Sequence, residues 1–173
     1  IQVRNKLTRI NGSLSVSTGF FIFASGATLE YTGSSNQTVG AEWPSNLPPT
    51  NVTLNKSAST LTSDAPLRVP RTLTMTSGTL AMGSNDLFIE GTLAGGDVAG
   101  GGTITSSGTI TMGRNLQEQF NQTITGSLTL SNLTISKAYS GGTDENNTLE
   151  VTGSPTITGN LTLAAGFLNV GIA

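Results

Sequence analysis

The stretch SGTLAMG at residues 77–83 returns as SGTITMG at residues 107–113, thirty positions later. A third copy, AGFLNVG at residues 165–171, keeps both glycines and the two apolar positions. Each copy sets a short alternation of apolar and polar residues between two glycines. Repetition at a fixed period of about 20 to 50 residues is typical of proteins built from stacked repeats.

A longer repeat overlies the short one. NQTV at residues 36–39 returns as NQTI at 121–124, and NVTLNK at 51–56 returns as NLTISK at 132–137. The offset between the first pair is 85 residues (121 minus 36). We therefore predict a single β-solenoid over residues 1–173 with about two modules. The first module covers residues 1–100, and the second, incomplete module covers residues 101–173.

Inside each repeat, apolar residues alternate with small polar ones. Alternation with a period of two indicates strands that bury one face. Gly, Asn and Ser separate the strands and allow tight corners. When such strands coil into a solenoid, each turn hydrogen-bonds to the next at about 4.8 Å, and the inward side chains stack into one core. The residues predicted to point inward are Leu73, Met75, Leu80, Met82, Ile104, Ile110, Met112, Leu128, Leu130, Leu161 and Leu163.

These patterns predict an all-β protein that folds as a single-stranded parallel β-helix. An antiparallel β-sandwich is the alternative, because short strands with turn signals every 8 to 12 residues or so also fit that fold. A sandwich places each strand in a different environment, whereas a solenoid repeats one environment at every turn. The near-identical copies therefore favour the solenoid.

Composition narrows the classes of function. Only 10% of the 173 residues are charged, the net charge is −2, and the chain has no Cys and no His. The charge predicts no binding to nucleic acid or to anionic membrane surfaces. Without thiolate or imidazole, cysteine nucleophiles, Ser-His triads and the usual zinc and haem sites are excluded. We therefore expect no enzyme activity and no cofactor. We also expect no membrane insertion, because no apolar run approaches the length of about 18 residues that spans a bilayer.

Several segments resemble the repeat regions of large secreted bacterial surface proteins of the Bacteroidota type. They are LEYTGSSNQTV at residues 29–39, NVTL at 51–54, LTMTSGTL at 73–80 and LFIEGTL at 87–93. The resemblance covers most of the chain. It implies a right-handed β-helix of adhesin or autotransporter type, located outside the cell or on its surface. It is a folding pattern and brings no functional residues with it.

The acidic residues are candidates for the side chains of a catalytic groove. Glycoside hydrolysis needs two carboxylates within about 5 to 10 Å of each other. Three glutamates, Glu30, Glu90 and Glu150, lie in similar repeat contexts and could form a ladder. The other acidic candidates are scattered along the sequence: Asp64, Asp86, Asp97, Glu118 and Asp144. A carbohydrate-binding or cleaving module of a surface enzyme, with cell-surface glycans as partners, is the alternative function.

One loop offers ligands for a metal ion. Asp144, Glu145 and Asn146 supply hard oxygen atoms of the kind that Ca²⁺ prefers. The loop lacks the spacing of an EF-hand and of the repeated calcium-binding β-helix turn. A simple polar turn is the favoured interpretation, so no metal site is assigned.

Threonines two residues apart could align as a flat array of hydroxyl groups, as in ice-binding solenoids. Such pairs occur at residues 72–76, 103–105, 109–111, 123–125 and 156–158. Thr is also a good strand former on a solvent-facing surface. Because the pairs fall at unequal spacings in the sequence, ice binding is a minor alternative.

Residues 41–50 interrupt the first module. Prolines exclude this segment from interior turns, so we expect it to bulge outward as a loop. Trp43, the only tryptophan of the chain, would then be a lateral contact with a partner or a lid packed on the side of the solenoid.

The ends of the chain predict self-assembly. Neither end carries an obvious polar cap or helix, and an exposed terminal turn offers unpaired strand edges. The candidate assembly residues are Ile1, Val3, Leu168, Val170 and Ile172. A contact between unlike ends does not close and builds a filament. We therefore expect a structural protein, either an adhesin stalk or a subunit of a head-to-tail homopolymer. The alternative is a mature or excised segment of a longer repeat protein.

Overall fold

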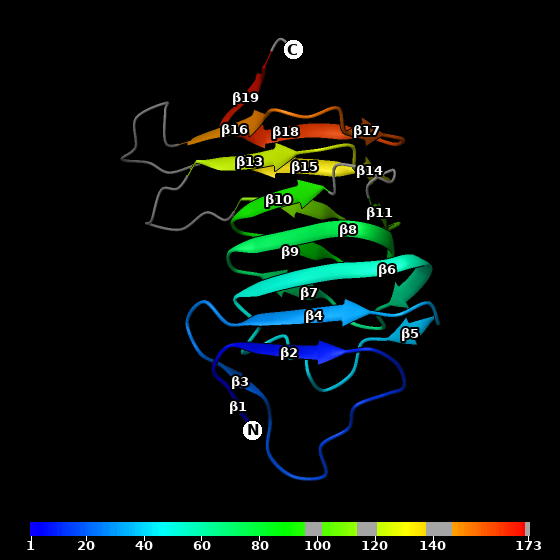
Figure 1. The fold of residues 1–173 in the computed structure, drawn as a ribbon. Helices are drawn as coiled ribbons and strands as arrows, with labels where there is room; N and C mark the ends of the chain where they lie inside the picture. The colour runs from blue at the N-terminus through cyan, green and yellow to red at the C-terminus, as the bar shows by residue number, and fades with distance from the viewer. Residues whose placement is uncertain (96–101, 114–120, 138–146, 172–173) are drawn as a thin grey trace.

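The computed structural model describes residues 1–95, 102–113, 121–137 and 147–171. The chain is a parallel β-solenoid of about six turns, stacked from the N-terminus at the bottom of Figure 1 to the C-terminus at the top. Every strand pair among the described residues is parallel. The predicted parallel β-helix is confirmed, and the antiparallel sandwich is wrong.

Each turn passes through three faces, which we number in chain order. Face 1 contains β2 (Lys6–Arg9), β4 (Thr28–Thr32), the first halves of β6 (Asn51–Thr62) and β8 (Thr72–Ala81), β10 (Thr92–Gly95), β13 (Gln122–Thr125), β16 (Thr148–Val151) and β19 (Phe167–Val170). Face 2 contains β5 (Gln37–Thr38), the second halves of β6 and β8, β11 (Thr103–Thr105), β14 (Thr129–Leu130) and β17 (Thr156–Ile157). Face 3 contains β7 (Leu67–Val69), β9 (Leu87–Ile89), β12 (Ile110–Met112), β15 (Leu133–Ser136) and β18 (Leu161–Ala165). A small sheet of β1 (Gln2–Val3) and β3 (Ile22–Phe23) lies at the N-terminal end.

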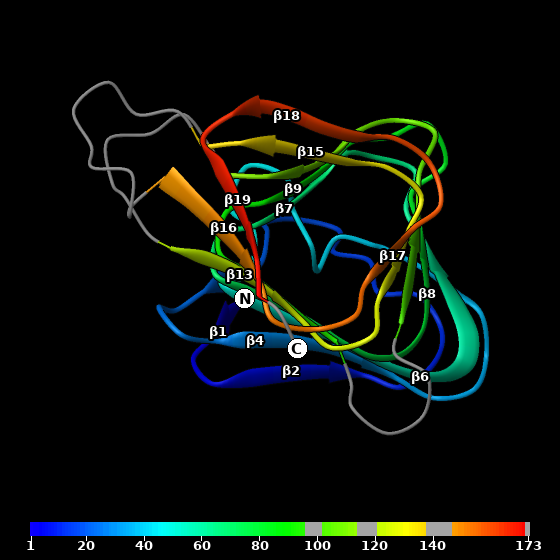
Figure 2. The ribbon, with the colours of Figure 1, turned by 90° about the horizontal axis from the view of Figure 1, so that it is seen from above.

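The coil is right-handed. In Figure 1 the front strands of face 1 run from left to right, and the chain then passes to the back at the right-hand side and climbs. Seen from above in Figure 2, the chain runs counter-clockwise as it rises toward the viewer. This is the hand that nearly all parallel crossover connections adopt.

Two strands bend around the corner between faces 1 and 2. In β6 the bend falls at Ser57 and Ala58, whose φ angles of 24° and 64° are unusual for residues with a side chain. In β8 it falls at Gly78, with φ of 87°. A Cβ atom at Gly78 would lie 2.7 Å from the carbonyl oxygen of Ser59 on the turn below. Glycine is therefore required there by conformation and by space.

Inward side chains stack in columns along the solenoid. On face 2 the column runs through Gln37, Leu61, Leu80, Ile104, Leu130 and Ile157. On face 3 it runs through Leu67, Leu87, Ile110, Leu133 and Leu161. One continuous cluster of buried residues extends from Leu29 to Val151 and spans both predicted modules.

Nine of the predicted inward residues are fully buried: Leu73, Met75, Leu80, Met82, Ile104, Ile110, Met112, Leu128 and Leu130. The other two, Leu161 and Leu163, are 49% and 54% exposed. Both keep the inward register, opposite Leu133 and Ile135. They are exposed because β18 is the last described strand of face 3, and no described turn covers it.

The sequence repeats do not return to the same face. SGTLAMG at residues 77–83 leads into face 2, SGTITMG at 107–113 forms face 3, and AGFLNVG at 165–171 forms face 1. The longer repeat is displaced in the opposite direction, since residues 51–56 lie on face 1 and residues 132–137 lie on face 3, which precedes face 1 in chain order. The second module is therefore turned by one face relative to the first. Each face can accept either repeat, because all three faces are built from short strands between tight corners.

Candidate functional surfaces

A buried polar cluster fills the core near the N-terminal end. Arg9 occupies an inward position of β2, directly opposite Tyr31 of β4. Its guanidinium pairs with the carboxylate of Glu42, donates to the carbonyl oxygens of Thr38 (2.8 Å) and Gly12, and lies over the Tyr31 ring. The Tyr31 hydroxyl donates to Glu42 at 2.7 Å. Burial, followed by the charge of Glu42, raises the pKa of Tyr31 well above its ordinary value.

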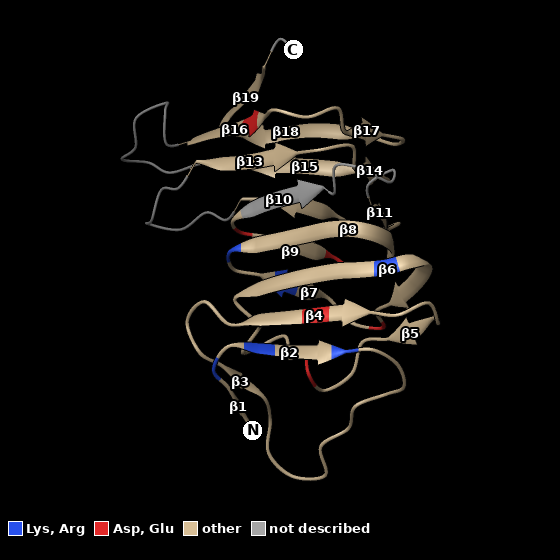
Figure 3. Ribbon diagram, in the orientation of Figure 1, with Lys and Arg blue, Asp and Glu red and all other residues tan. Residues whose placement is uncertain are grey.

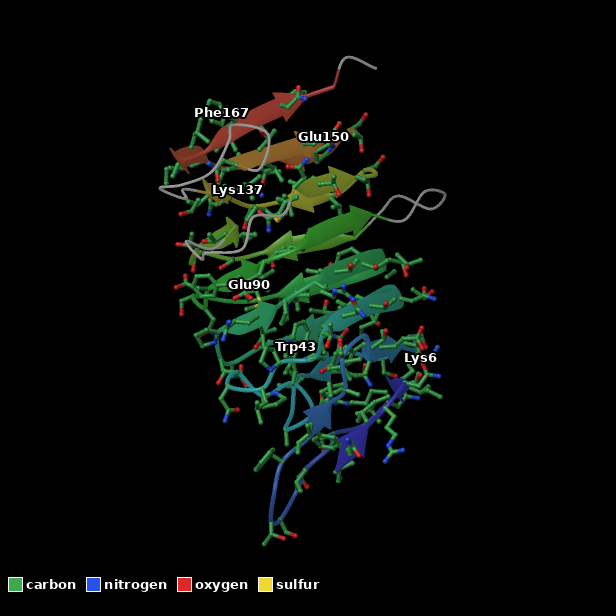
Figure 4. The ribbon with its side chains drawn as sticks, turned by 90° about the vertical axis from the view of Figure 1, so that its left-hand side faces the viewer. Lys6, Trp43, Glu90, Lys137, Glu150 and Phe167 are labelled. Carbon is green, nitrogen blue, oxygen red and sulfur yellow. The ribbon has the colours of Figure 1, made fainter. Side chains whose placement is uncertain are left out.

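The segment of residues 41–50 turns inward at Glu42 and Trp43. Trp43 is 3% exposed, stacks on Tyr31 with ring centroids 6.2 Å apart, and donates its indole N–H to the carbonyl oxygen of Arg68 at 3.0 Å. Figure 4 shows the labelled side chain within the body of the solenoid. The expected outward bulge is wrong at these two residues, and Trp43 is not available as a lateral contact. Glu42 is drawn inside because the buried guanidinium of Arg9 requires a counter-charge.

Two lysines that are related by the long repeat are also buried. Lys56 donates from Nζ to the side-chain oxygen of Gln37 at 2.7 Å and to the carbonyl oxygen of Ser35 at 2.9 Å. Burial lowers the pKa of Lys56, and the charge of Arg9 adds to this effect. Lys137 is 6% exposed, and burial lowers its pKa to about 8. The two lysines occupy corners at the ends of different faces, in line with the one-face displacement of the modules.

The N-terminal end is partly covered. Val3, Phe21 and Ala27 form a second buried cluster, against which Leu14 and Val16 pack from the loop between β2 and β3. In Figure 1 this loop hangs below the first turn. Among the N-terminal assembly candidates, Val3 is therefore buried, whereas Ile1 is 66% exposed.

The last described turn is uncovered. The apolar side chains of Leu161, Leu163, Phe167 and Val170 are all exposed, and Leu168 is partly buried against the core. Figure 4 shows Phe167 on the uppermost turn. Among the described strands, β17, β18 and β19 each pair with one neighbour only. The fifth assembly candidate, Ile172, lies outside the described residues.

The described acidic residues are spread over several turns (Figure 3). Glu30 accepts from Thr8 at 2.9 Å and pairs with Lys6 at 3.0 Å, and the bond from Lys6 lowers the pKa of Glu30. Glu90 pairs with Arg68 at 2.7 Å. Asp86 accepts a hydrogen bond from the backbone of Thr109, and Asp64 is exposed. Glu150 on β16 lies five strands along face 1 from Glu30 on β4.

The remaining acidic candidates, Asp97, Glu118 and the proposed calcium loop at Asp144, Glu145 and Asn146, lie outside the described residues. Within the described ranges, no group of three or more metal-binding side chains is present. No helix of the described part is long and apolar enough to cross a membrane.

Threonines align in register on the outside of face 2. One column runs through Thr60, Thr79, Thr103, Thr129 and Thr156 on five successive turns. A second column, two residues further along each strand, contains Thr38, Thr62, Ala81 and Thr105. Of the pairs named from the sequence, those at 103–105 and 156–158 belong to face 2, whereas those at 72–76 and 123–125 belong to face 1 and Thr111 belongs to face 3. The unequal spacings therefore place most of the predicted pairs on different faces, and the aligned column is completed by Thr60, Thr79 and Thr129.

Comparison with protein-family models, with curated proteins and with solved structures gives no match. The resemblance to bacterial surface proteins is thus supported at the level of the fold alone, as a parallel β-solenoid built from repeats.

Proposed function

We propose that this chain is an extracellular structural protein, a rod that lengthens by stacking further turns, as a surface stalk or as a subunit of a head-to-tail filament. The uncovered last turn carries the proposal. Its inward columns end in the exposed Leu161 and Leu163, and each of its strands has a partner on one side only among the described strands. A further turn of the same fold would bury these side chains and pair that edge. In a stalk the next segment of the same chain supplies this turn, and in a filament a second copy does.

The arrangement of charge favours a structural role over catalysis. The described glutamates Glu30 and Glu90 are each paired with a basic side chain, and Glu42 is buried against Arg9. The proposal therefore includes no catalytic residue and no cofactor. Its expected location is the cell surface or the surrounding medium, where the implied partner is another copy of the chain.

Electron microscopy and sedimentation of the 173-residue chain test the filament form. We expect rods that lengthen with protein concentration. The double variant Leu163→Glu/Val170→Glu places charges on the uncovered turn and should stop this growth. Thr134→Glu, on the outside of face 3 one turn below Leu163, is the control and should leave the growth intact. A monodisperse monomer at high concentration, or equal association of the two variants, contradicts the filament.

A further inference from the structure

We propose that face 2 binds ice, with the two threonine columns as the contact surface and crystalline water as the ligand. The proposal does not depend on self-assembly. It starts from the register of the first column, in which Thr103 faces Thr79 on one side and Thr129 on the other. Identical side chains thus repeat at every turn from Thr60 to Thr156. We call these two columns the threonine face.

The dimensions of the threonine face follow from the backbone. Successive turns are about 4.8 Å apart, and residues two apart on a strand are separated by about 6.6 Å. The hydroxyls of Thr103 and Thr105 on one strand, and of Thr79 and Thr129 on neighbouring turns, therefore lie on a two-dimensional grid. Water oxygens on the faces of hexagonal ice repeat at distances of this size. A grid of hydroxyls can hold water molecules in positions that continue the ice lattice.

The hydroxyls are free to bind water. Within the described part of the chain, no hydrogen bond to a protein group engages the hydroxyls of Thr60, Thr79, Thr103, Thr129 or Thr156. The β-branched side chain of threonine has few rotamers, and the backbone ladder holds each one in place. Binding ordered water therefore costs little protein entropy.

The other two faces provide an internal comparison. Outward threonines also align on the other faces, as strand propensity predicts: Thr53 faces Thr74 on face 1, and Thr111 faces Thr134 on face 3. The faces differ in charge, since face 1 includes Lys6, Glu30 and Glu150 among its outward residues, and face 3 includes Arg68. The described strands of face 2 carry no charged residue (Figure 3). An uncharged grid fits an uncharged lattice, whereas a fixed charge would keep its own hydration shell.

Ice growth in a solution of the 173-residue chain tests the proposal, by thermal hysteresis and by inhibition of ice recrystallisation. We expect the chain to inhibit recrystallisation and to shape ice crystals. The variant Thr103→Lys/Thr129→Lys should lose both effects, because it places two charges on adjacent turns of the threonine face. The matched control is Thr111→Lys/Thr134→Lys, an outward pair on adjacent turns of face 3, and it should retain both effects.

Circular dichroism and thermal melting check that each variant keeps the fold. If the lysine variant of face 2 unfolds, Thr103→Val/Thr129→Val removes the hydroxyls with little change of shape and should weaken the inhibition. Ice that grows in the presence of the parent chain as it does in buffer overturns the proposal. Equal loss of activity in the face 2 variant and the face 3 control also overturns it, because the threonine face would then have no special role.

Discussion

Ile135 and Leu163 are register partners on adjacent turns of face 3, yet Ile135 is fully buried and Leu163 is 54% exposed. The two side chains occupy the same column and point to the same side of the sheet. They differ only in that Ile135 has a turn above it and Leu163 has none among the described residues. An inward side chain of this protein is therefore buried only when another turn stacks on its own turn.

The substitutions Ile135→Asp and Leu163→Asp test this relationship. Ile135→Asp buries an unpaired charge and should cost about 3 kcal/mol or more in the free energy of unfolding. Leu130→Asp, in the buried column of face 2, should have a similar cost in the free energy of unfolding. Leu163→Asp should cost less than about 1 kcal/mol, because its carboxylate remains in water. Equal costs for Ile135→Asp and Leu163→Asp, measured by denaturant unfolding, would show that the last turn is not open.

The buried pair of Arg9 and Glu42 predicts strong coupling. Arg9→Met leaves the Glu42 carboxylate buried without its counter-charge and should cost about 3 to 5 kcal/mol. The double variant Arg9→Met/Glu42→Leu removes both charges and should recover most of that loss. Arg71→Met, at an exposed arginine, is the control and should change stability by less than about 0.5 kcal/mol. Additive costs in the double-mutant cycle would contradict the pairing.

Lys137 predicts a pH dependence of stability. Its pKa is about 8 in the folded chain, against the ordinary value of 10.5. Between these two values the unfolded chain binds more protons, so this group makes the folded state more stable as the pH rises. Lys137→Met removes this titrating group. The unfolding free energy of the variant relative to that of the parent should therefore fall as the pH rises from about 8 to about 10.5, whereas a difference that does not change with pH would refute the lowered pKa.

Alanine substitutions at Gly78 and Gly83 distinguish the cost of backbone strain from the cost of a steric clash. Both have positive φ, so alanine should cost about 1 kcal/mol at each for conformation alone. A Cβ at Gly83 meets nothing within 4 Å, whereas one at Gly78 lies 2.7 Å from the oxygen of Ser59 and 2.9 Å from Cβ of Lys56. Gly78→Ala should therefore cost about 3 kcal/mol. The close stacking at this corner would be refuted if both variants melted at the same temperature.

Local alternation was sufficient to predict the strands and most of the core, because period-two patterning depends on each residue and its immediate neighbours. Leu80 and Ile104 illustrate this, since both are buried as expected. The identity of the neighbouring turn could not be predicted in the same way. Repeat matching aligns Leu80 with Ile110, whereas the backbone pairs it with Ile104. All three faces use the same strand-and-corner pattern, so sequence similarity does not distinguish them.

The polar cluster was missed although a signal for it exists. Leu7 and Arg9 follow the same alternation, which places Arg9 on the inward side of its strand. An arginine at an inward position requires a buried counter-charge. Which carboxylate supplies it depends on where residues 41–50 return to the core, and the prolines in that segment predicted an outward loop instead.

The pairing of adjacent turns can be measured with spin labels, since the chain has no native cysteine. Thr79 and Thr103 are register partners on the outside of face 2, whereas Thr109 lies at the start of face 3. Nitroxide labels on Thr79→Cys/Thr103→Cys should give the strong dipolar broadening of neighbouring strands, and labels on Thr79→Cys/Thr109→Cys should not. The three-faced solenoid predicts this order of the two couplings. Stronger coupling between positions 79 and 109 would contradict it, because the sequence repeats would then stack directly upon each other.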